Sequence, residues 1–136
     1  MELSNQSQVM GGILFLSLVA VELGGRAVLR MTRGQDPATD LQLTFSRAGH
    51  GHAGMFVTLA LVAQVFVDTT DLDGAGEWVA RSGIAIAAIL IPAAFFLSVL
   101  GKGVTTPNRL FVLLPIGAVL LAAGAATLGV GLLAAA

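Results

Sequence analysis

Long apolar stretches alternate with short polar ones along the whole chain. The apolar stretches cover approximately residues 10–30, 44–67, 78–100 and 110–134. Each is close to the length of about 20 residues that an α-helix needs to cross the hydrocarbon core of a bilayer. None shows the alternating segments of about 10 residues that are typical of a membrane β-barrel. The pattern therefore predicts an all-α integral membrane protein, a four-helix bundle in one domain of residues 1–136.

The composition agrees with a lipid environment. Hydrophobic residues make up 56% of the chain and charged residues only 11%, whereas soluble domains carry about 25% charged residues. The absence of cysteine excludes disulfides and thiolate metal sites. The net charge of −1 argues against nucleic acid as a partner. Membrane lipids are the partners that the composition predicts.

The three polar connectors, at residues 31–43, 68–77 and 101–109, differ in charge. Six of the seven basic residues lie in or beside the first and third connectors, and the second is acidic apart from Arg81 just beyond it. Cytoplasmic loops of membrane proteins collect Lys and Arg. We therefore expect the first and third connectors to face the cytoplasm and both termini to lie outside. The acidic connector is interpreted as solvated.

Ionisable residues inside two of the spans are the main candidates for function. They are Glu22, Arg26, Arg47, His50 and His52. Such groups are costly in a bilayer and mark functional sites. Glu22 and Arg26 stand four apart and share a helical face. We expect all five to meet in one layer near the cytoplasmic side, shielded from lipid, with Asn108 and Arg109 closing the cluster from below.

Several chemical roles are open to this cluster. Glu22 and Arg26 form either an internal ion pair or, with Glu22 as acceptor, part of a path for protons or cations. Histidine titrates near neutrality and is a common metal ligand. His50 and His52 point about 200° apart on a regular helix. A metal or haem site at His50, His52 and Glu22 therefore requires the glycine-rich turn to unwind, whereas hydrogen bonds to different neighbours do not.

Two local patterns in the last third of the chain predict structural detail. Thr106 and Pro107 have the residue types of an N-cap and a first helical position. Ala118, Ala122 and Ala126 repeat every four residues, which favours close helix packing in membranes. We expect self-association or assembly into a larger membrane complex through such small-residue faces.

Three segments resemble a family of small uncharacterised actinobacterial membrane proteins. These are Phe45–Gly54, Thr106–Leu110 and Leu128–Leu133, and the likeness extends over nearly the whole chain. The resemblance implies a four-helix, multi-pass protein of the bacterial cytoplasmic membrane and carries no known activity.

A second resemblance is to the membrane-associated eicosanoid and glutathione metabolism (MAPEG) family. Arg47, Ala48 and His50 partly match the motif that opens its second helix. The resemblance implies trimers with outside termini and a glutathione-type activity. The Asn and Glu that the family carries further along this helix are missing, since Gly54 and Met55 stand in that region.

The leading functional interpretation is non-enzymatic. It is a binding or transport module whose polar cluster receives a proton, an ion or a small ligand. The first alternative is a structural or accessory subunit of a larger membrane complex, in which the cluster only holds helices together. The second is a small membrane enzyme of MAPEG type.

Overall fold

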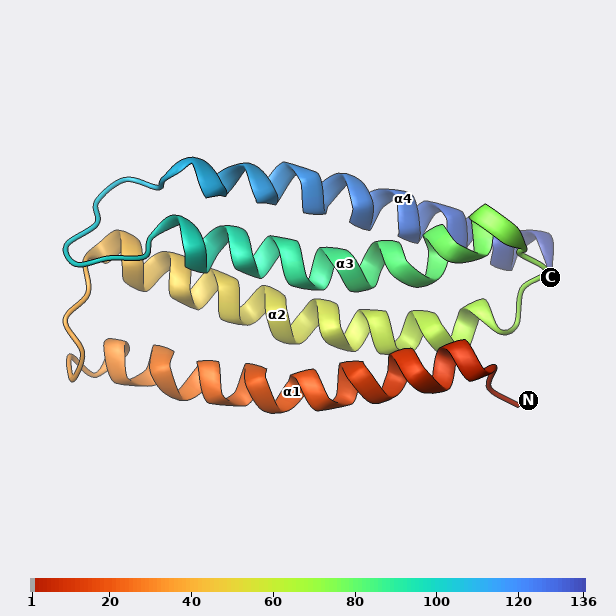
Figure 1. The fold of residues 1–136 in the computed structure, drawn as a ribbon, viewed down its shortest axis with the longest axis horizontal. Helices are drawn as coiled ribbons and strands as arrows, with labels where there is room; N and C mark the ends of the chain where they lie inside the picture. Colours follow the sequence, from red (N-terminus) through yellow and green to blue (C-terminus); the bar gives the residue numbers. More distant parts are fainter. Residues whose placement is uncertain (1) are drawn as a thin grey trace.

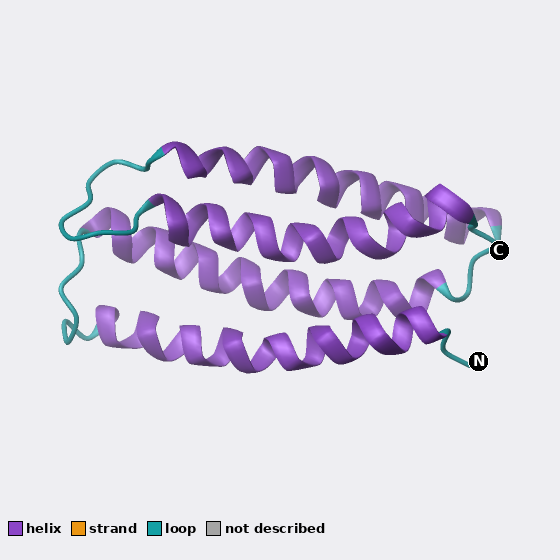
Figure 2. Ribbon diagram, in the orientation of Figure 1, coloured by secondary structure: helices purple, strands orange, loops and turns teal. Residues whose placement is uncertain are grey.

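The computed structural model describes residues 2–136 and consists of helices joined by short connectors (Figures 1 and 2). The four long helices are α1 (Asn5–Thr32), α2 (Asp40–Val67), α3 (Gly74–Ser98) and α4 (Leu113–Ala134), and a 3₁₀ turn, η1 (Arg109–Val112), precedes α4. The described residues contain no strand. All four helices are long and apolar enough to cross a membrane. The prediction of an all-α chain with four helices of membrane-spanning length and apolar content is confirmed.

Both termini lie at one end of the bundle, beside the α2–α3 connector (Figure 1). The α1–α2 and α3–α4 connectors lie at the opposite end. We call this opposite end the basic end, because six of the seven Lys and Arg residues lie on it. The end with the termini is called the acidic end, after Asp68, Asp71, Asp73 and Glu77.

Helices that follow one another in the chain are neighbours in space. The backbone of α1 approaches only α2, α2 packs mainly on α3, and α3 packs along α4. Because the α1 backbone approaches neither α3 nor α4, the bundle has an open side between α1 and α3. The most buried helix is α3, which lies between two neighbours along its length.

Glycine allows α3 and α4 to approach closely. A Cβ atom on Gly83 would lie 2.8 Å from the carbonyl oxygen of Leu120 and 3.0 Å from Cα of Gly124. The buried face of α4 therefore follows its glycines, whereas the predicted alanine stripe at 118, 122 and 126 is exposed. Small residues do pack α3 and α4 together, but on α4 these residues are glycines on the face opposite the alanines.

Side-chain caps determine where the helices begin. The Ser4 hydroxyl accepts a hydrogen bond from the Ser7 backbone at α1, and Thr39 with Gln42 forms a capping box at α2. The cap predicted at Thr106 is wrong. The helical turn begins two residues later than predicted, at Arg109, and Asn108 caps η1 by accepting from the Leu110 backbone N–H at 2.8 Å.

Candidate functional site

The predicted cluster of ionisable residues does not assemble. Glu22 and Arg26 are exposed and line a shallow depression on the outer face of α1. Within residues 2–136, no hydrogen bond or ion pair joins either of them to His50 or Arg47. The predicted burial of Glu22 and Arg26 is wrong, while a binding role for them stays a prediction.

Glu22 is exposed because of the rotation of α1 about its own axis. Val21 and Gly24 face the interior of the open side. Glu22 is two residues from Gly24, and two residues correspond to about 200° of rotation on an α-helix. The helix packs its apolar and small residues inward, so the Glu22 carboxylate points outward.

The residues expected around the cluster also have separate positions. The Arg47 guanidinium reaches across to the Thr32 hydroxyl at 3.3 Å and is exposed. The Asn108 side chain donates to the Leu97 carbonyl at 3.0 Å, so it ties η1 to the end of α3. Arg109 is exposed in η1. The prediction that Asn108 and Arg109 close the cluster is therefore wrong.

The two histidines contact different neighbours, as their spacing predicts. The His52 ring stacks on Phe95, with centroids 5.2 Å apart, and its Nδ1 lies 2.7 Å from the Ala48 carbonyl. His50 is half-buried against α1, where a Cβ atom on Gly25 would lie 2.8 Å from its Cε1. No group of three or more potential metal-binding side chains occurs among the described residues. The histidines thus contribute to two unrelated environments.

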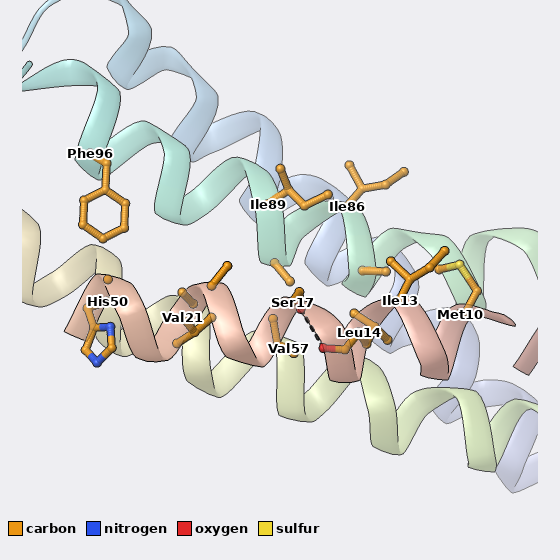
Figure 3. Close-up of a pocket in the computed structure, with 15 residues that line it drawn as sticks. Met10, Ile13, Leu14, Ser17, Val21, His50, Val57, Ile86, Ile89 and Phe96 are labelled. Atoms are coloured by element: carbon orange, nitrogen blue, oxygen red, sulfur yellow. Dashed lines mark hydrogen bonds between the residues drawn. The ribbon is translucent and has the colours of Figure 1, made fainter. Parts of the chain in front are cut away.

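The open side of the bundle forms an apolar groove of about 480 Å³, called here the α1–α3 groove (Figure 3). Residues of α1 and α3 form its two walls and α2 forms its floor. His50 and Phe96 lie at its basic end, and Met10 and Ile13 lie towards its acidic end. The α1 wall extends from Met10 to Gly24, which is about 21 Å at 1.5 Å per residue.

Among the described residues, two polar side chains line the α1–α3 groove, Ser17 and His50. The Ser17 hydroxyl donates to the Leu14 carbonyl of its own helix at 2.7 Å. The His50 ring makes no hydrogen bond to any described residue. His50 is therefore the lining side chain whose polar atoms are free to bind a ligand.

A buried polar network, which the sequence analysis missed, joins three helices at the acidic end. Its centre is Arg81 on α3, only 4% exposed. The guanidinium donates to Asp68 Oδ1 at 2.6 Å, to Glu77 Oε1 at 2.9 Å and to the Ser7 hydroxyl at 2.6 Å. Ser4 donates to both carboxylate oxygens of Asp68 at 2.9 Å.

This network corrects the expectation that the acidic connector is simply solvated. Burial raises the pKa of Asp68, but hydrogen bonds from Arg81 and from the Ser4 backbone outweigh it and hold that pKa at about 2. Two signals were available in the sequence. Arg81 follows Glu77 by four residues, and it is the one basic residue at the acidic end.

The network also explains how α1 is held in place. The backbone of α1 approaches only α2, yet the Ser7 hydroxyl donates to the Gln64 carbonyl of α2 at 3.0 Å and accepts from Arg81 of α3. At the basic end, the hydrogen bond from Arg47 to Thr32 is the only one between side chains of α1 and α2 among the described residues. The α1 wall of the groove is thus anchored by polar contacts mainly at its acidic end.

Comparisons of the chain with protein-family models, with curated proteins and with solved structures found no match.

Proposed function

We propose that this chain is a multi-pass protein of the bacterial cytoplasmic membrane that binds one lipid-like molecule in the α1–α3 groove. The observation that carries the proposal is the groove itself, about 480 Å³ in volume, with nearly continuous apolar walls and one free polar side chain at one end. Ligand sites are typically concave, mainly apolar and equipped with a few polar groups that orient the ligand.

The proposed orientation follows from charge. Cytoplasmic loops collect Lys and Arg, so the basic end faces the cytoplasm and both termini lie outside. His50 is opposite Gly25, seven residues before the end of α1. In a hydrocarbon core of about 30 Å, the polar end of the groove then lies close to the cytoplasmic interface. A ligand binds with its polar part there and its chain along the groove.

A filled groove tests this function. Ala20 is exposed and lines the α1 wall, so Ala20→Phe places a ring in the groove without disturbing the buried core. We expect this variant to lose crosslinking to a photoactivatable fatty acid or phospholipid in proteoliposomes. Val130→Phe is the matched control, because Val130 is exposed on α4 and lies outside both the groove and the row of Ala118, Ala122 and Ala126. Equal crosslinking of both variants would refute the groove as a binding site.

Two of the other candidate functions, a proton path through Glu22 and a MAPEG-type activity, have direct tests. A proton path through Glu22 requires a shielded carboxylate, and the exposed position of Glu22 gives that mechanism no support. Equal proton flux through wild type and Glu22→Gln in proteoliposomes would remove it. A MAPEG-type activity requires glutathione binding, and its absence in a calorimetric titration would remove that alternative.

A structural or accessory subunit is the second candidate, and the exposed alanines of α4 favour it. Ala118, Ala122 and Ala126 lie on the outer face of α4, and small residues allow another membrane helix to pack closely. Self-association or a stable partner predicts a complex larger than the 13.8 kDa chain. If this face of α4 is the interface, Ala122→Phe dissociates the complex in mild detergent. A wild-type protein that is monomeric in the same detergent contradicts the role of structural subunit.

A further inference from the structure

We infer that the outer face of α1 binds a second copy of this chain. In the resulting parallel pair of α1 helices, Glu22 of each copy binds Arg26 of the other. This face is turned away from the groove wall of α1, so the inference does not depend on the proposed lipid site. It assigns an interaction surface and a partner to the two ionisable residues that the fold turns outward.

Glu22 lies at a depth at which a carboxylate in contact with lipid is unfavourable. The 28 residues of α1 extend for about 42 Å, so the helix exceeds a hydrocarbon core of about 30 Å by about 6 Å at each end. Glu22 precedes the last residue of α1, Thr32, by about 15 Å, which places it about 9 Å inside the hydrocarbon. Ionisable residues at such depths normally face protein or water and are paired. Glu22 therefore needs a protein surface over it.

The described part of the chain does not supply that surface. Within residues 2–136, Glu22 and Arg26 take part in no ion pair and their side chains make no hydrogen bond. The α1 helix lies at the edge of the bundle, and its backbone approaches only α2 (Figure 1). Leu16, Val19 and Leu23 are exposed on the same outer face. The uncovered surface therefore combines an acid, a base and large apolar side chains.

The shape of this face suits a second helix. A depression of about 320 Å³ is lined by Val19, Glu22, Leu23 and Arg26, whose spacing of i, i+3, i+4 and i+7 is that of the hole that receives one side chain of a facing helix in a coiled coil. Exposed residues extend this pattern along α1 at alternating intervals of four and three. They are Gly12, Leu16, Val19, Leu23, Arg26 and Arg30. Such an alternation forms the seam between two supercoiled helices.

The charges identify the partner as a second copy. Two copies inserted in the same direction have parallel α1 helices, and a two-fold axis brings the same face of each together. Glu22 and Arg26 are separated by about 6 Å along the helix, which a long arginine side chain spans to reach the carboxylate of the other copy. The two acids and two bases carry no net charge together. An ion pair within one helix would still face lipid, whereas the reciprocal pairs lie between two helices.

Cysteine crosslinking tests the face directly, because the chain has no cysteine of its own. Val19→Cys lies in the depression, and Ala20→Cys, one residue further on the groove wall, is the matched control. In proteoliposomes of the full-length protein, oxidation should convert most of Val19→Cys and little of Ala20→Cys into a disulfide-linked dimer. Equal crosslinking of the two variants, or a Val19→Cys protein that stays monomeric, overturns the inference.

Charge reversal tests the reciprocal pairing. Glu22→Arg places four cations in the pair and Arg26→Glu places four anions, so each variant alone should raise the dissociation constant of the dimer at least about thirtyfold. A mixture of the two variants again places an acid opposite each base and should dimerise. Energy transfer between donor-labelled and acceptor-labelled copies in proteoliposomes measures both. Both positions are exposed, so the substitutions leave the buried core unchanged.

The remaining outcomes are equally specific. Dimers of either charge variant alone, or a mixture that stays monomeric, overturn the pairing of Glu22 with Arg26. Capture of a different protein by Val19→Cys, in place of a second copy, overturns the choice of partner. Ala122→Phe should leave the crosslinking of Val19→Cys unchanged, because the backbones of α1 and α4 are not in contact, and its loss would overturn the assignment to α1. Lipid crosslinking tests the groove alone, so the proposed function and this inference fail separately.

Discussion

Replacing Arg81 by methionine should be the most damaging single change in this protein. Arg81 links α1, α2 and α3 through Ser7, Asp68 and Glu77. Methionine has a similar length and no charge, so Arg81→Met keeps much of the packing and removes all three hydrogen bonds. The Asp68 carboxylate then remains buried, and Ser4 is its remaining hydrogen-bond donor among the described residues.

The size of the effect follows from burial. The side chains of Arg81 and Asp68 are each 5% exposed. Removing one partner of a buried ion pair costs about 3–5 kcal/mol, because the other charge stays buried without compensation. We expect Arg81→Met to lower the free energy of unfolding by this amount. Glu77→Gln should cost less, about 1 kcal/mol, because the Glu77 side chain is 30% exposed.

The single tryptophan provides the assay. Trp78 lies one helical turn before Arg81, so its fluorescence reports on this part of α3 during reversible unfolding by sodium dodecyl sulphate in mixed micelles. Arg33→Met is the control, because Arg33 is exposed at the other end. Its free energy of unfolding should stay within about 0.5 kcal/mol of wild type.

A second substitution tests the physical cause. If the cost of Arg81→Met comes from the buried negative charge, adding Asp68→Asn should recover at least about 1 kcal/mol. A double variant no more stable than Arg81→Met would show that the charge is not the cause. An Arg81→Met protein as stable as wild type would refute the account of the network altogether.

Two further predictions concern pH and helix packing. The pKa of Asp68, about 2 against an ordinary 3.8, means that its stabilisation is complete above pH 4 and is lost as the pH falls to 2. The loss is about 2 kcal/mol and should be absent in Asp68→Asn; identical pH profiles of the two proteins would contradict it. Gly83→Ala should destabilise the protein by about 1–3 kcal/mol, because its Cβ atom would lie 2.8 Å from the Leu120 carbonyl oxygen of α4. Gly129→Ala meets nothing within 4 Å and should be neutral or slightly stabilising in the same unfolding assay; equal losses in both alanine variants would refute the glycine contact between α3 and α4.

The sequence alone was sufficient to predict the four helices and the separation of charge between the two ends. Span length and apolar content are local properties, and the rise of 1.5 Å per residue converts residue number into position along a helix. For this reason Glu22 lies within one helical turn of the level of His50, which packs opposite Gly25, as the residue count predicted. His50 and His52 also point to different neighbours, because their spacing on one helix determines their relative direction.

Only the tertiary structure decided which polar side chains meet. The direction of a side chain changes by 100° with each residue, and the rotation of each helix about its axis depends on packing against its neighbours. That packing turns Glu22 outward and brings Arg81, Asp68 and Ser7 together from three helices. The α1–α3 groove has the same origin, because it exists only where α1 contacts α2 and stays apart from α3.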